Sequence, residues 1–196
     1  MKPISHIIYI LIASLFFAVL PQKAAAQFYV QGTNNVKTKW QQQKSENYKI
    51  IYPKHFETTA NRIANLLDTI APAISYGMIR SNIPIPIVLE TQNQYSNGMV
   101  VWAPKRMELV PTAPTSTYAT PWLRQLAIHE YRHAAQISNL KVGLGKVAGG
   151  VLGEAGIGLA TAVISAWQFE GDATNAETQL TEFGREIGRA SCRERV

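Results

Sequence analysis

Residues 121–140 constrain the fold of this chain more than any other segment. Thr120-Pro121 is a helix start signal, because an N-cap residue is followed by proline at the first helical position. Side chains then recur with the three- and four-residue spacing of one helix face, at Trp122, Leu126, His129, His133, Ile137 and Leu140. The spacing predicts an amphipathic helix whose buried face carries both histidines.

This helix contains the pattern His-Glu-x-x-His over residues 129–133. Two histidines four residues apart point the same way on a helix, so both imidazoles can reach one metal ion. Glu130 between them is suited to act as general base on a zinc-bound water rather than as a ligand. The alternative is two core histidines that donate to backbone carbonyls, and it leaves Glu130 unexplained. The pattern predicts a Zn2+ site with His129 and His133 as ligands.

The third zinc ligand has few candidates. A catalytic zinc ion takes three protein ligands and a water. After residue 26 the only other histidine is His55, far upstream, and the only cysteine is Cys192, near the end of the chain. Carboxylates after the helix remain, namely Glu154, Glu170, Asp172, Glu177, Glu182 and Glu186.

Two of these carboxylates have a second possible role. Glu154 is a lone acidic residue in an apolar stretch, so it is a competing ligand, an ion-pair partner or a residue that orients a histidine. Glu177 lies seven residues after Glu170 and shares its helix face, so it too can orient a ligand histidine.

The two ends of the chain differ from the part between them. Residues 1–26 have a short apolar run closed by Ala24-Ala25-Ala26, which predicts a secretory signal peptide cleaved after Ala26 and export to the periplasm or cell envelope. Residues 187–196 show a burst of arginine without apolar periodicity, and they resemble translated adapter sequence. We expect a non-native tail on a truncated gene; the alternative is a basic disordered terminus.

The charge of the chain comes mostly from these ends. The whole chain has a net charge of +6, whereas residues 27–186 carry 14 basic and 12 acidic side chains, a net charge of +2. We therefore expect no nucleic-acid partner. Cysteine is absent from residues 27–186, so no disulfide framework forms and one modest domain must rely on its core.

Local patterns predict an α+β fold. A strand is expected over 48–52 and a helix over 56–78, broken or kinked near Pro72. The run Ile83–Leu89 contains two prolines and is expected to be an edge strand or a strand preceded by a turn. Ser96-Asn97-Gly98 predicts a hairpin turn, followed by strands over 99–102 and 107–110. This hairpin is expected beside the metal helix, where an edge strand can pair with an extended substrate.

The segment after the metal helix is rich in glycine. Residues 142–167 contain seven glycines and only two charged side chains. We expect a closely packed buried segment, and membrane association is not favoured because dense glycine weakens an isolated helix. A second helix is expected over 168–183. The resulting architecture is a small antiparallel or mixed sheet, followed by the metal helix and a second ligand-bearing helix.

Residues 167–173, Trp-Gln-Phe-Glu-Gly-Asp-Ala, resemble the W-x-x-E-G-x-A segment of gluzincin metallopeptidases, the peptidase MA type. In these enzymes a second helix supplies the third zinc ligand, so the resemblance implies this role for Glu170. Thirty-six residues separate His133 from Glu170, within the range of such enzymes. Thr174 stands where thermolysin-like relatives carry a second-shell aspartate, and Asp172 or Glu177 are the available substitutes.

The resemblance extends over roughly residues 36–185. Residues 40–53, 102–109, 129–133 and 170–178 are similar to a group of exported Bacteroidetes proteins, in which a peptidase MA-like domain precedes TolB-type propeller repeats. It implies a zincin-type fold over residues 27–186, incomplete here, and a C-terminal propeller in the full-length protein.

The expected activity is zinc-dependent hydrolysis of peptide bonds in a peptide or protein substrate. Glu130 takes the proton of the water and passes it to the leaving amine. Tyr131 points to another face of the helix, so no residue stands out as the oxyanion stabiliser. The alternative is a non-catalytic envelope module that binds peptide or stabilises a propeller-bearing assembly.

Overall fold

The structure is a computed structural model that describes residues 9–10, 34–46, 48–79, 83–102, 104–114, 121–153, 156–158, 161 and 164–181. The chain divides into two units, Met1–Val30 and Gln31–Val196, and in the first only the helical residues Tyr9 and Ile10 are described. The predicted signal-peptide cleavage site, the tail 187–196, Glu154 and Cys192 lie outside the described residues. No described helix combines the length and the hydropathy that crossing a bilayer requires.

The second unit is built on a mixed five-stranded sheet with the strand order β1-β2-β3-β5-β4. Strand β1 (Trp40–Lys44) pairs antiparallel with β2 (Tyr48–Pro53), which pairs parallel with β3 (Ile85–Leu89). Strand β3 pairs parallel with β5 (Lys105–Val110), and β4 (Asn97–Trp102) closes the sheet antiparallel to β5. The sheet and its helices confirm the predicted α+β class with a mixed sheet.

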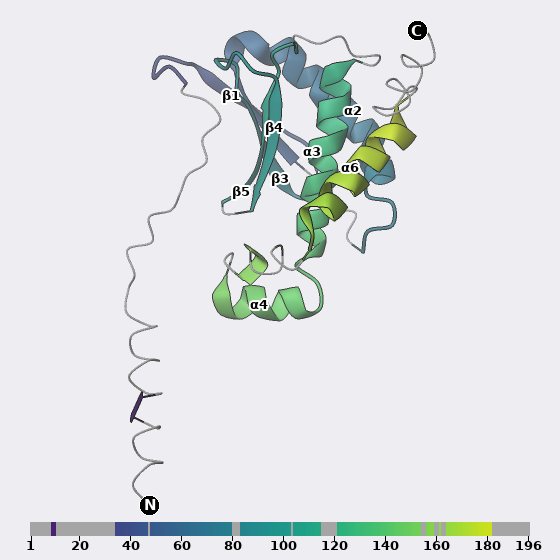
Figure 1. Ribbon diagram of the computed structural model, residues 1–196. Coiled ribbons are helices and arrows are strands. Elements are labelled where there is room, and N and C mark those ends of the chain that lie inside the picture. The colour runs from purple at the N-terminus through teal and green to yellow at the C-terminus, as the bar shows by residue number, and fades with distance from the viewer. Residues whose placement is uncertain are drawn as a thin grey trace, which may run out of the picture. The chain divides into compact units, whose positions relative to one another are not determined.

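Three helices lie on one side of this sheet (Figure 1). Helix α2 (Glu57–Ile74) follows the short 3-10 helix η1 (Lys54–Phe56), and α3 (Trp122–Asn139) packs between α2 and the strands β4 and β5. Helix α6 (Ala166–Leu180) packs against α3 and α2. Because strand side chains alternate between faces, every second residue of β2, β3 and β5 enters the core, including Ile50, Ile87, Leu89, Met107 and Leu109.

Two predictions about proline were partly wrong. Strand β3 is the central strand and not an edge, although it contains Pro86. The ladder between β3 and β5 begins only at Ile87, so Pro86 pairs with β2 alone and needs no donor on its other side. In α2, Pro72 lies within the last turn, and the helix continues to Ile74 without a break.

The predicted turn at Asn97-Gly98 was also wrong. Both residues belong to β4, where Gly98 pairs with Leu109. The chain reverses instead between Trp102 and Lys105, which face each other across the hairpin. Tertiary structure overrides the local turn signal here. A side chain at position 98 would clash with Glu130 of α3, so glycine is required within the strand.

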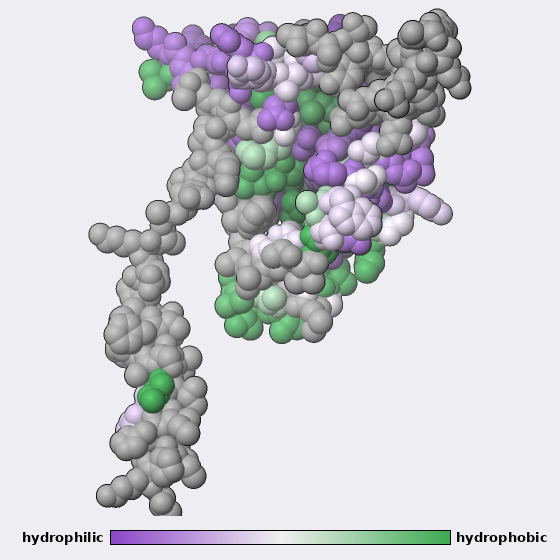
Figure 2. All heavy atoms as spheres, viewed as in Figure 1, coloured by the Kyte–Doolittle hydropathy of each residue, from purple (hydrophilic) through white to green (hydrophobic). Residues whose placement is uncertain are grey.

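The glycine-rich segment was predicted to be buried, but its largest described apolar side chains are exposed. Helix α4 (Leu144–Leu152) carries Val147, Val151 and Leu152, which are 64%, 78% and 52% exposed. Figure 2 shows hydrophobic surface over this helix, at the lower end of the view. Among the described side chains of residues 142–167, Ile157 is the one apolar side chain that is buried.

Candidate metal centre

Three side chains predicted as zinc ligands meet at one point between α3 and α6. The Nε2 atoms of His129 and His133 lie 2.9 Å apart, one helical turn from each other on α3. Glu170, in the second turn of α6, places its Oε2 atom 3.3 Å from His129 and its Oε1 atom 3.4 Å from His133. Among the described residues, this is the one group of three or more potential ligands that can hold a metal ion.

The donor set and its spacing fit zinc. Zinc binds imidazole nitrogen and carboxylate oxygen at about 2 Å, and tetrahedral geometry then holds the ligand atoms about 3.3 Å apart. Each histidine nitrogen lies at this separation from a different oxygen of Glu170, and the two nitrogens are slightly closer to each other. With one ligand atom per residue, all three lie within 4.8 Å of one another. The histidine side chains are 10% and 14% exposed, whereas that of Glu170 is 64% exposed, so the group opens toward solvent on the carboxylate side.

His129 is oriented by a buried carboxylate. Its Nδ1 atom donates to Oε1 of Glu177, a residue of α6 with no exposed surface. The other oxygen of Glu177 accepts from the amide of Gln125 at 2.7 Å. A hydrogen bond from Nδ1 to a carboxylate leaves Nε2 free to bind metal and raises its basicity. Asp172 and Glu177 were both candidates to orient a ligand histidine, and Glu177 makes this bond with His129 directly.

His133 is oriented through a longer chain of contacts. Its Nδ1 atom lies 2.8 Å from Oε1 of Gln136, three residues further along α3. The amide nitrogen of Gln136 donates to Asp172 at 2.7 Å, and Asp172 accepts two bonds from Arg132. Asp172 therefore touches neither histidine and contacts His133 only through Gln136.

The electrostatics of the two histidines differ. Burial by itself lowers the pKa of His129, but the hydrogen bond to Glu177 and the charges of nearby carboxylates, first among them Glu130, raise it above its ordinary value. For His133, burial is the largest cause and the pKa is lowered, since the neighbouring charge of His129 acts in the same direction. The hydrogen bonds from Arg132 lower the pKa of Asp172, which keeps that carboxylate ionised.

Glu130, the predicted general base, lies against the edge strand. A Cβ atom at Gly98 would lie 2.4 Å from Cγ and 2.6 Å from Oε1 of Glu130, so only glycine permits this approach. Glu130 is 6% exposed and belongs to the wall of the same cavity as the candidate ligands. The close contact explains why a residue typical of a turn stands within a strand.

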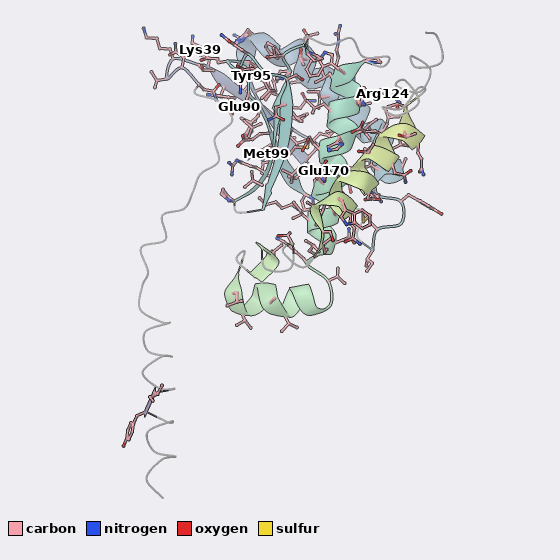
Figure 3. All side chains as sticks on the ribbon, in the orientation of Figure 1. Lys39, Glu90, Tyr95, Met99, Arg124 and Glu170 are labelled. Atoms are coloured by element: carbon pink, nitrogen blue, oxygen red, sulfur yellow. The ribbon has the colours of Figure 1, made fainter. Side chains whose placement is uncertain are left out.

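The cavity beside the site has a volume of about 540 Å³. Strand β4 forms one wall and the start of α6 another; Met99 and Glu170, labelled in Figure 3, lie on these two walls. Apolar side chains form most of the remaining lining, namely Val100, Ile137, Ile164, Ala166 and Phe169. The volume is typical of a pocket that holds a small molecule or part of a peptide.

The predicted face of α3 borders this cavity at His129, His133 and Ile137, while Leu126 of the same face packs against the core. Its fully buried side chains belong to a different stripe, which includes Ala127, Ile128, Tyr131 and Ala134. Tyr131 lies in the core cluster, as its predicted direction away from the site requires. His55 is exposed in η1, whereas the ligand group lies on α3 and α6, so His55 is not part of that group.

Local sequence patterns did not indicate three residues that shape the site. The pattern around Gly98 is typical of a turn, and no pattern marks Arg132 or Gln136 as part of a site. The available signal for Gln136 was its spacing, because a polar residue three positions after a ligand histidine shares its helix face.

The chain matches no protein-family model, no curated protein and no solved structure.

Proposed function

We propose that this domain is a zinc-dependent, metallopeptidase-like hydrolase of peptide bonds that acts outside the cytoplasm. The observation that carries the proposal is the convergence of His129, His133 and Glu170 on one point in the wall of a cavity that also contains Glu130. The proposed ligands are these two histidines and Glu170, and the proposed general base is Glu130. A zincin-type fold is part of the same proposal.

The chemistry divides between the metal and the protein. Zinc bound by such ligands lowers the pKa of a water molecule toward about 7 and polarises a carbonyl group. Glu130 accepts a proton from the attacking water and passes it to the leaving amine, which requires a carboxylate within hydrogen-bond reach of both. Glycine at position 98 leaves the space that this position of the Glu130 side chain requires.

The edge of the sheet is suited to an extended substrate. Strand β4 is the last strand in the sheet order and pairs only with β5 among the described strands. Its residues Met99 and Val100 line the cavity, so a peptide added along this edge would pass the candidate metal site. Main-chain pairing of this kind favours a peptide or protein substrate.

The proposal is tested by metal analysis and peptide cleavage with the purified chain. Wild type, His55→Ala and Glu130→Gln should contain stoichiometric zinc, whereas His129→Ala and His133→Ala should lose it, because only the latter two remove ligands. His55→Ala is the matched control, since that histidine is exposed in η1. Retention of zinc in both ligand variants would contradict the proposal.

Cleavage of a peptide library, read by mass spectrometry, tests the chemistry. Glu130→Gln should lower hydrolysis by about 10²- to 10⁴-fold with zinc retained, because an amide cannot accept the proton. Zinc binding without cleavage by wild type would favour the non-catalytic peptide-binding module. Glu170→Ala should weaken zinc binding more than Glu154→Ala; the opposite order would make Glu154 the third ligand.

A further inference from the structure

The amide of Gln136 has one permitted orientation. Its nitrogen faces Oδ2 of Asp172 at 2.7 Å and the carbonyl oxygen of Phe169 at 3.1 Å, both of which only accept hydrogen bonds. Turning the amide over would place its oxygen against these two oxygens. The contacts of the nitrogen therefore direct the oxygen of Gln136 toward His133.

This orientation determines which nitrogen of His133 carries the hydrogen. The amide oxygen 2.8 Å from Nδ1 can only accept, so Nδ1 is the protonated nitrogen of the neutral ring. Its Nε2 then has a free lone pair, directed at the point where His129 and Glu170 also converge. A ring protonated on Nε2 instead would present a hydrogen to that point and could not bind a metal there.

Asp172 is itself held in place from the other side. Nε and Nη2 of Arg132 donate to its two oxygens at 2.7 and 2.8 Å, a bidentate pair with a guanidinium that is always charged. The remaining nitrogen, Nη1, donates to the carbonyl oxygens of Ile74 and Tyr76 at the end of α2. The carboxylate is thereby fixed as an acceptor facing Gln136.

We propose that Asp172 is a positioning residue which, through Gln136, sets the tautomer of His133 to the form that can bind a metal. The inference rests on the proposed zinc site but concerns a property of the metal-free protein. His129 directs its Nδ1–H at Glu177 without an intermediate residue, so the two ligand histidines are oriented by different routes.

Asp172→Asn tests the proposal with almost no change of shape. Asparagine has one acceptor oxygen where aspartate has two, and Arg132 donates to both positions. The amide of Gln136 is then no longer held in one orientation and can turn over to offer its nitrogen to His133. Histidine tautomers are read in the metal-free chain from long-range ¹⁵N–¹H correlation spectra. We expect His133 to be protonated on Nδ1 in wild type and to shift toward the Nε2 form in this variant, while His129 keeps its Nδ1–H toward Glu177.

The double variant Gln136→Glu with Asp172→Asn should restore the acceptor that faces His133. Its glutamate accepts from Nδ1 of His133, and the total charge equals that of wild type, but its second oxygen faces the carbonyl oxygen of Phe169 and loses the bond made there by Gln136. Zinc affinity, measured by competition with a chelating dye, should fall about tenfold to hundredfold in Asp172→Asn and recover part of that loss in the double variant. Glu57→Gln removes an equal charge from an exposed position on α2 and should change neither measurement.

Several outcomes would overturn the inference. These are an Nε2-protonated His133 in wild type, an unchanged tautomer in Asp172→Asn, or a double variant as weak as the single one. The wild-type spectrum decides the matter even if a variant does not fold. If the tautomers behave as expected but wild type binds no zinc, the proposed function fails and the positioning role of Asp172 stands.

Discussion

At the scale of single residues, the side chain of Glu130 lies so close to the backbone of β4 that position 98 has no room for a Cβ atom. The carboxylate lies in the cavity wall together with His129, His133 and Glu170. Its position therefore depends on an absent Cβ atom on a neighbouring strand as much as on its own helix.

Gly98→Ala should lower hydrolysis while zinc binding is retained. The new methyl group would displace Glu130, and loss of a positioned general base costs about 10²- to 10⁴-fold in rate. Gly150→Ala is the matched control, because a Cβ atom at that position in α4 meets nothing within 4 Å. Peptide cleavage and zinc content should be measured on both variants. Full activity of Gly98→Ala would contradict the proposed role of Glu130.

Tyr131 stands next to the proposed base in sequence but has a different environment. Burial raises its pKa to about 12, and its Oη atom has no hydrogen-bond partner among the described residues. A phenol that stays neutral and faces the core is not suited to proton transfer at the site.

Tyr131→Phe should stabilise the protein and leave the site unchanged. Removing a buried hydroxyl without a partner is expected to raise the free energy of unfolding by about 1 kcal/mol. Urea unfolding gives this quantity, and zinc content and cleavage should equal those of wild type. A loss of stability would show that the hydroxyl has a bonding partner, and a loss of cleavage would give it a catalytic role.

At the scale of elements, α3 has two functional faces. One stripe enters the core between α2 and the sheet, and the other borders the cavity and carries the histidines. Helix α4 has no such role in the core, because its largest described side chains are exposed.

Truncation of apolar side chains should distinguish these helices. Ile128 in α3 has no exposed surface, so Ile128→Ala should cost about 2–5 kcal/mol in unfolding free energy through lost contacts and a cavity. Val147→Ala removes a side chain that is 64% exposed in α4 and should change stability by less than about 0.5 kcal/mol. Thermal and urea unfolding measure both. Equal costs would indicate that the apolar surface of α4 is covered in solution.

At the scale of the whole domain, Arg132 joins three helices. It belongs to α3, donates to the carbonyl oxygens of Ile74 and Tyr76 at the end of α2, and holds Asp172 of α6. Because α6 also carries Glu170 and Glu177, this contact couples the packing of the helices to the assembly of the site.

This contact should make stability sensitive to acid. The hydrogen bonds from Arg132 lower the pKa of Asp172 below its ordinary value of 3.8, so the stability it contributes is present above that pH and is lost as the pH falls through the lowered pKa. With chelator present, the difference in unfolding free energy between wild type and Asp172→Asn should be largest above about pH 4 and shrink in stronger acid. A difference independent of pH would show that the ionised carboxylate is not responsible.

Much of α3 and of its metal-binding pattern was predictable, because both are local. Helical spacing placed α3 within a residue or two of its ends, and the four-residue interval brings the two Nε2 atoms to 2.9 Å. The strand predicted over 48–52 and the helix predicted over 168–183 also follow from short-range patterns, and they correspond to β2 and to α6, which ends earlier, at Leu180.

Longer-range features were predictable only where few candidates existed or a resemblance supplied them. The segment around Glu170 was identified by its resemblance to gluzincins, and the structure brings that carboxylate to the histidines. Nothing local could distinguish Asp172 from Glu177 as the partner of His129, because the choice depends on how α6 lies against α3.

The amino-acid sequence by itself determined that α3 is amphipathic, that its histidines point together, and that Glu130 stands between them, since each follows from neighbours within two turns of a helix. Only the tertiary structure decided that Gly98 lies in a strand against Glu130, and that Glu177 and Asp172 take different tasks. These contacts join residues more than thirty positions apart, and their geometry is set by the burial of the whole core rather than by any local pattern.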